Sequence, residues 1–98
     1  MPIFEVTDRF KKDYAGLDLA DRQRFERVVR EQFVADLDSG HGLRPGLRVR
    51  GVQGARGVYE MTWAPDGRAT WQYDPERSPG MQHIIWRRIG THDVFRTP

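Results

Sequence analysis

The sequence predicts an α+β fold in which an N-terminal strand and an αα-hairpin pack on one face of a mainly antiparallel, twisted sheet. Two observations predict this class. Apolar residues in the first half recur every three or four positions, as in amphipathic helices, whereas those from residue 47 onward alternate with polar residues, as in half-buried strands. The 98 residues suffice for a single domain covering 1–98, with a sheet of about four to five strands.

The N-terminal segment is predicted to form a short strand followed by a first helix. Residues 3–6 alternate in the way a strand requires, and the hydroxyl of Thr7 can then cap a helix. Gly16 lies near the end of that helix. The apolar face of the helix consists of Phe10, Tyr14 and Leu17.

A second helix is expected from about Leu19 to Leu37, with Asp18 as its N-terminal cap. Its end is marked by residues 39–42, which include two glycines. The two helices would form an αα-hairpin with one shared apolar face. The stripe of the second helix consists of Phe25, Val28, Val29, Phe33 and Leu37.

Four strands are predicted in the second half, at residues 47–52, 58–63, 68–73 and 83–89. The Pro65-Asp66-Gly67 turn would join the middle two as a hairpin. The last strand is apolar on both faces, which is typical of an interior strand.

The alternation divides the side chains of the sheet between two faces. Apolar residues of the first three strands would face the helices, namely Leu47, Val49, Tyr59, Met61, Trp63, Trp71 and Tyr73. A one-residue slip would reverse a strand's contribution. The opposite face would carry Arg48, Arg50, Glu60, Thr62, Arg68, Thr70, Gln72 and Arg87.

Charge is unevenly spread along the chain, although the net charge is only +2. Residues 1–43 hold seven Lys/Arg and nine Asp/Glu, a balance of −2, whereas residues 44–98 hold nine and five, a balance of +4. This uneven distribution of charge favours two surfaces that bind different partners. The alternative is that the helices simply carry mixed charges and the strands happen to use arginine.

The composition narrows the expected environment and chemistry. The absence of cysteine excludes disulfides and thiolate metal sites. No signal peptide is visible at the N-terminus, and no apolar run approaches the roughly 20 residues that span a membrane. The three histidines lack nearby carboxylates at ligand spacing, so no metal site is expected. We therefore expect a cytoplasmic protein that uses no membrane, metal or cofactor.

The C-terminal run combines groups suited to phosphodiester chemistry. The imidazole of His92 can exchange a proton near neutral pH, and two arginines, Arg87 and Arg88, could hold a phosphate. An aromatic ring, Phe95, follows the histidine three residues later. In an arginine-rich chain, this combination points toward RNA.

Three segments carry a resemblance to a known family: Gly51–Glu60, Arg68–Tyr73 and Arg88–Phe95. The first is similar to a strand entry rich in glycine and arginine, and the second to an Arg-x-x-x-Tyr strand with one extra residue. The third resembles an Arg-x-Gly-Thr-His run followed by a terminal Phe, here one residue sooner. Together with element order, they make the chain resemble the RelE/ParE superfamily of toxin–antitoxin toxins, and most closely its YafQ-like branch.

The resemblance implies a function and several residue roles. Toxins of the RelE and YafQ branches cleave mRNA on the ribosome without metal and are inhibited by a cognate antitoxin. The resemblance implies that His92 is catalytic, that Phe95 is the terminal aromatic and that Arg68 faces the phosphate. The other histidines of the YafQ pattern have no match, because His41 and His83 lie elsewhere.

Metal-free RNA cleavage needs a base, an acid and positive charge around the phosphate. His92 could act as acid or base, and Glu60 is a candidate base because it is the one carboxylate predicted on the polar face. Arg68 and Arg87 suit bidentate phosphate binding. The remaining candidate RNA contacts are Arg48, Arg50, Arg56, Arg88 and Phe95.

Alternatives remain at the level of residues and of function. His92 could cap a turn, Glu60 could pair with Arg68 across the hairpin, and the basic strand face could be solvated or bind antitoxin. A ParE-like protein that inhibits DNA gyrase without catalysis is the main functional alternative. A degenerate member that only binds antitoxin or RNA is the other.

Overall fold

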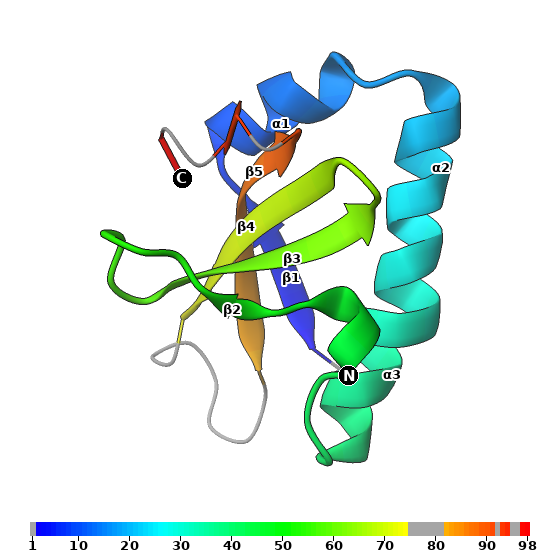
Figure 1. The fold of residues 1–98 in the computed structure, drawn as a ribbon, viewed down its shortest axis with the longest axis vertical. Helices are drawn as coiled ribbons and strands as arrows, with labels where there is room; N and C mark the ends of the chain where they lie inside the picture. The colour runs from blue at the N-terminus through cyan, green and yellow to red at the C-terminus, as the bar shows by residue number, and fades with distance from the viewer. Residues whose placement is uncertain (1, 75–81, 92, 95–96) are drawn as a thin grey trace.

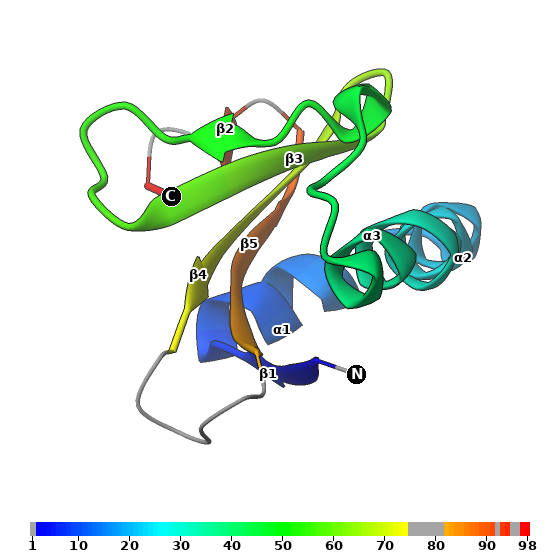
Figure 2. The same ribbon diagram turned by 90° about the horizontal axis from the view of Figure 1, so that it is seen from below.

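The computed structural model describes residues 2–74, 82–91, 93–94 and 97–98. Within them, one five-stranded sheet with the order β1-β5-β4-β3-β2 carries helices on one face (Figure 1; Figure 2). The elements are β1 (Ile3–Val6), α1 (Asp8–Ala15), α2 (Leu19–Val28), the π-helical η1 (Val29–Phe33), α3 (Val34–Ser39), the 3₁₀-helical η2 (Pro45–Leu47), β2 (Arg50–Gly51), β3 (Val58–Ala64), β4 (Gly67–Tyr73) and β5 (His83–Gly90).

The helical half begins at the predicted caps. The Thr7 hydroxyl accepts from the Phe10 amide at 3.1 Å, and the Asp18 carboxylate accepts from the Asp21 amide at 2.8 Å. The long second helix is confirmed as one helical segment, but a π-helical stretch interrupts it between α2 and α3. Gly40 ends α3 in the left-handed conformation with φ of 73°.

The sheet is mainly antiparallel, as the sequence predicts. β5 pairs antiparallel with β4 and parallel with β1, so the expectation that the last strand is an interior one is confirmed. β3 and β4 form the predicted hairpin. The parallel β1–β5 pair joins the two ends of the chain, and in Figure 2 these strands lie against α1.

The predicted strand at residues 47–52 is wrong in most of its length. Pro45 begins a 3₁₀ turn, Arg48 adopts a left-handed φ of 50°, and only Arg50 and Gly51 pair with β3. Proline favours such a turn because its φ is fixed and it has no amide donor. The apolar pattern nevertheless reported burial correctly, since Leu47 is only 1% exposed.

Aromatic rings fill the space between the helices and the sheet. Phe25 meets Trp86 with ring centroids 5.3 Å apart, and Phe33 meets Trp71 at 5.2 Å. The largest fully buried side chain is Trp71. The apolar side chains of β3 and β4 point toward this interface, so the residues between them point to the other face of the sheet.

Candidate functional site

The face of the sheet opposite the helices, called here the open face, carries the predicted polar set. Register pairs Glu60 with Thr70 and Thr62 with Arg68. Their sequence neighbours Met61, Ala69 and Trp71 are buried in the core, which fixes the polar residues on the outer side. The open face is formed by Arg50, Glu60, Thr62, Arg68, Thr70, Gln72 and Arg87.

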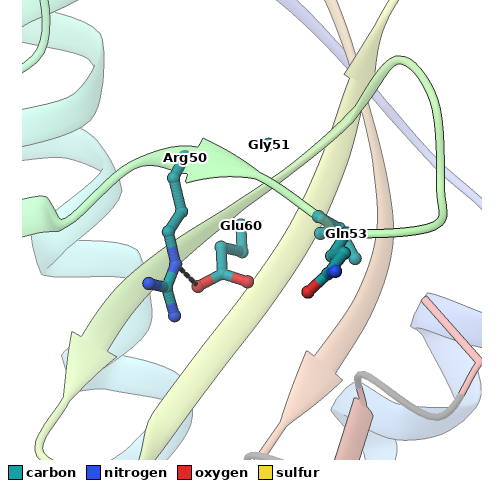
Figure 3. Close-up of a pocket in the computed structure, with 5 residues that line it drawn as sticks. Arg50, Gly51, Gln53 and Glu60 are labelled. Atoms are coloured by element: carbon teal, nitrogen blue, oxygen red, sulfur yellow. Dashed lines mark hydrogen bonds and ion pairs between the residues drawn. The ribbon is translucent and has the colours of Figure 1, made fainter.

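An ion pair organises the β2 end of this face. Arg50 Nε lies 2.7 Å from Glu60 Oε1, and the Glu60 side chain is only 9% exposed whereas that of Arg50 is 73% exposed (Figure 3). The proposed pairing of Glu60 with Arg68 is therefore wrong. Arg68 instead donates to the carbonyl oxygens of Ala64, Pro65 and Gly67, the shortest at 2.9 Å to Gly67.

Two adjoining hollows lie on the open face. One of about 280 Å³, the arginine hollow, gathers the predicted Arg48, Arg50, Glu60 and Arg68, and is lined also by Val49 and Thr62. The second, of about 370 Å³, is lined by Arg50, Gly51, Val52, Gln53 and Glu60 (Figure 3). Arg50 and Glu60 line both hollows, so the two adjoin at the Arg50–Glu60 ion pair.

The two arginines of β5 lie at the register shift between Thr70 and Trp71, and both line a hollow with Thr97 and Pro98, but their other partners differ. Arg87 reaches the open face, where it donates to the side chain of Gln72 and, at 2.9 Å, to the carbonyl oxygen of Pro98. Arg88 is engaged with α1.

The contact of Arg88 is an ion pair with Asp13. Nε of Arg88 lies 2.6 Å from Asp13 Oδ2, and both side chains are nearly buried, at 13% and 14% exposure. Asp13 also accepts from the Ile89 amide at 3.2 Å. The role of Asp13 could not be predicted from local sequence patterns, since 75 residues separate it from Arg88.

Other predicted residues lie apart from the hollows. Arg56 is exposed in the β2–β3 connection and lines neither hollow. His83 is buried at the start of β5, and neither ring nitrogen has a hydrogen-bond partner among the described residues. His92 and Phe95 lie outside the described residues, so their predicted roles stay predictions.

No group of three or more His, Cys, Asp or Glu side chains within residues 2–74, 82–91, 93–94 and 97–98 is arranged to hold a metal ion. No helix in these ranges has the length and apolar character needed to cross a membrane.

No protein-family profile and no curated protein matches the chain. Solved structures do match. The E. coli DinJ–YafQ toxin–antitoxin complex contains a chain with a TM-score of 0.65 at 16% identity, covering 95% of this chain and 94% of that one. The RelB–RelE complex from Methanococcus jannaschii contains a chain with a TM-score of 0.62 at 15% identity, and the match covers 95% of each chain. A YoeB/ParE toxin from Agrobacterium tumefaciens has a TM-score of 0.65 at 15% identity, and the match covers 92% of this chain and 98% of that one.

These likenesses extend over nearly the whole chain, and they match the element order predicted from the sequence. At such low identities they establish the architecture. The fold that the sequence resemblance implies is thus confirmed: this chain has the same fold as the YafQ, RelE and YoeB/ParE toxins in these structures.

Proposed function

We propose that the chain is the toxin of a type II toxin–antitoxin system, a ribosome-dependent endoribonuclease that cleaves mRNA without metal and so blocks translation. The fold supports the toxin role, because chains of this fold were solved as DinJ–YafQ and RelB–RelE complexes. The observation that carries the nuclease proposal is the arginine hollow, which Arg48, Arg50 and Arg68 line together with Glu60.

Phosphate binding is the role of the arginines in this proposal. A guanidinium stays protonated at all relevant pH and can donate two parallel hydrogen bonds to phosphate oxygens. Arg68 would hold the scissile phosphate from the arginine hollow, and Arg87 would hold it from β5, exchanging its Pro98 acceptor for RNA. Their charge would stabilise the crowded transition state.

Proton transfer needs one group to take the proton of the 2′-hydroxyl and one to protonate the leaving oxygen. We assign His92 to this chemistry, with Glu60 as the second group within the arginine hollow. Arg48, Arg50 and Arg56 would contact the RNA backbone, and Phe95 would stack on a base. Arg88 is proposed as an anchor between β5 and α1, because Asp13 already occupies its guanidinium.

The proposed partners follow from the same surface. mRNA on the ribosome would meet the basic open face, and a cognate antitoxin would inhibit by covering it. An acidic, extended antitoxin segment would complement the guanidinium groups of Arg48, Arg50 and Arg68. The protein would work in the cytoplasm, where mRNA is translated.

Growth arrest on induction tests the proposal. We expect His92→Ala and Arg68→Ala each to abolish arrest while keeping the urea unfolding transition of the parent protein. Arg24→Ala, an exposed helix arginine away from both hollows, is the matched control and should remain toxic. The site assignment fails if both site variants are folded and still toxic.

A second candidate function is ParE-like inhibition of DNA gyrase without catalysis, and the observation that favours it is the YoeB/ParE neighbour. This second function predicts growth arrest while cellular mRNA stays intact. A degenerate member that only binds antitoxin or RNA predicts no arrest at all.

A further inference from the structure

Thr97 and Pro98, called here the 97–98 segment, are held by the two arginines of β5. Arg87 Nε donates to the main-chain oxygen of Pro98 at 2.9 Å, and the Thr70 hydroxyl donates to the same oxygen at 3.4 Å. Arg88 Nη1 donates to the main-chain oxygen of Thr97 at 2.9 Å and to its hydroxyl at 2.8 Å. Oxygen atoms of the segment therefore occupy donors on both arginines.

The burial of Thr70 shows that the open face is covered at this point. Thr70 belongs to that face and pairs in register with Glu60, yet it is 0% exposed. Its hydroxyl and the Arg87 guanidinium converge on one oxygen atom, that of Pro98. A phosphate oxygen would use the same two donors. The 97–98 segment and a phosphate therefore exclude each other at the Arg87 end of the proposed phosphate site.

The 97–98 segment can leave this position at low cost. Thr97 is exposed and Pro98 is only half-buried, so little buried surface is lost when they detach. Departure would leave Arg87 with the neutral amide of Gln72 as its partner among the described residues. The freed guanidinium could then bind a charged oxygen more strongly than a neutral one.

A basic hollow of about 200 Å³ lies beside the segment and offers RNA a point of approach. Asp13 offsets Arg88 at 2.6 Å and lies 3.8 Å from Arg9, so one carboxylate faces the guanidiniums of Arg9, Arg87 and Arg88. Net positive charge therefore remains to attract a phosphate. The hollow is lined by Thr7, Arg9, Arg87, Arg88, Thr97 and Pro98.

We propose that the 97–98 segment is an intramolecular competitor of RNA. It occupies the Arg87 end of the phosphate site in the free protein and leaves when an RNA phosphate binds to Arg87 and Thr70. This inference rests on the proposed function and adds a limit on RNA affinity that is built into the chain. The apparent affinity is reduced to the fraction of molecules in which the segment is detached.

Binding of a short, labelled single-stranded RNA, oligo(U), tests the competition. We use the His92→Ala protein to prevent cleavage and measure Kd by fluorescence anisotropy. Thr97→Gly combined with Pro98→Gly keeps both main-chain oxygens, but it removes the Thr97 hydroxyl and makes the segment more flexible. We expect this double variant to bind RNA about fivefold more tightly, the ratio that corresponds to the loss of about one hydrogen bond from the docked segment.

Two arginine backgrounds locate the competition. In the Arg87→Ala protein the double variant should give no gain in affinity, because RNA and the segment no longer share that donor. In the Arg68→Ala protein RNA should bind more weakly, but the fivefold gain should persist. The hydrogen bonds of Arg68 among the described residues do not reach the 97–98 segment.

A spin label measures the displacement directly. The chain has no cysteine, so Pro98→Cys provides a single labelling site and keeps the main-chain oxygen that Arg87 binds. Saturating oligo(U) should convert the broad spectrum of a docked label into the sharp spectrum of a mobile one. A label at Ala20→Cys, on the exposed start of α2, is the matched control and should not respond.

The outcomes separate this inference from the proposed function. The competition is overturned, while RNA binding stands, if parent and double variant bind oligo(U) equally or if the gain persists in the Arg87→Ala protein. A Pro98→Cys label that saturating RNA does not mobilise overturns it as well. Absence of oligo(U) binding by all of these proteins overturns the phosphate site itself, and the competition with it.

Discussion

Glu60 determines how charge is arranged on the open face. Its nearly buried carboxylate neutralises part of Arg50 and holds the guanidinium at the junction of the two hollows. Arg68 has only neutral carbonyl partners among the described residues, so its charge is not offset there. The proposed phosphate contact would therefore form at the Arg68 side of the arginine hollow.

Tyr14 gives a residue-scale prediction about alkaline stability. Burial and the hydrogen bond that its hydroxyl donates to Glu26 raise its pKa from 10.0 to about 12. Between these values the unfolded chain has released the proton and the folded protein still binds it. Unfolding then releases a proton, and stability falls as pH rises.

Tyr14→Phe should remove this part of the alkaline decline. We expect the parent to be the more stable protein at neutral pH, with a difference that shrinks as pH rises above about 10. Urea unfolding of both proteins from about pH 8 to about pH 11 measures it. A constant difference over that range would contradict the proposed role of the hydroxyl.

At the scale of elements, α1 and its N-terminal cap contact β5 where the register of β5 with β4 shifts. The Thr7 hydroxyl donates to the Arg87 carbonyl at 2.9 Å, and Asp13 accepts from both the Arg88 side chain and the Ile89 amide. Contacts from the two ends of α1 thus bracket the residues where β5 departs from regular pairing with β4.

Asp13→Ala should be strongly destabilising, because it leaves the Arg88 guanidinium nearly buried without its counter-charge. We expect a loss of about 3 kcal/mol in the free energy of unfolding. Glu31→Ala removes a carboxylate from an exposed pair with Arg30 and should cost at most about 0.5 kcal/mol. Equal effects in urea unfolding would refute the structural role of the Asp13–Arg88 pair.

The β3–β4 hairpin depends on a close approach at Gly67. A Cβ atom there would lie 2.6 Å from Trp63 Cε2 and 2.9 Å from the Ala64 Cβ. Gly67→Ala should cost about 1–3 kcal/mol, because the buried indole ring has to shift. Gly46→Ala, which meets no atom within 4 Å, should change stability by less than about 0.5 kcal/mol. Thermal unfolding of both variants distinguishes this steric cost from a general effect of replacing glycine.

At the scale of the whole molecule, sequence periodicity predicted most of the fold because it reports burial. Alternation placed Glu60 and Arg68 on one face, and helical spacing placed Phe25 and Phe33 in the core. Features without a periodic signature were missed. The π-helical stretch follows no distinct pattern, and β2 pairs through only two residues.

The site was only partly predictable, for a related reason. Residue type and strand face sufficed to identify Arg48, Arg50, Glu60 and Arg68 as candidates, and these line one hollow. Pairing depends on positions far apart in the sequence, so neither the Arg50–Glu60 pair nor the role of Asp13 followed from local patterns.

The division of the sheet into two faces connects this fold to its proposed function. The helices pack against the apolar face, so the core and the proposed site use different side chains of the same strands. Substitutions on the open face can therefore test the proposed RNA binding while leaving the aromatic core intact.

Mapping of cellular mRNA 5′ ends after induction tests the central proposal most directly. The proposal predicts cuts within translated regions that keep a fixed phase with the codons and disappear in the His92→Ala and Arg68→Ala proteins. Growth arrest with intact mRNA would contradict it and favour a protein target. Cuts that persist in both folded variants would contradict the assigned site.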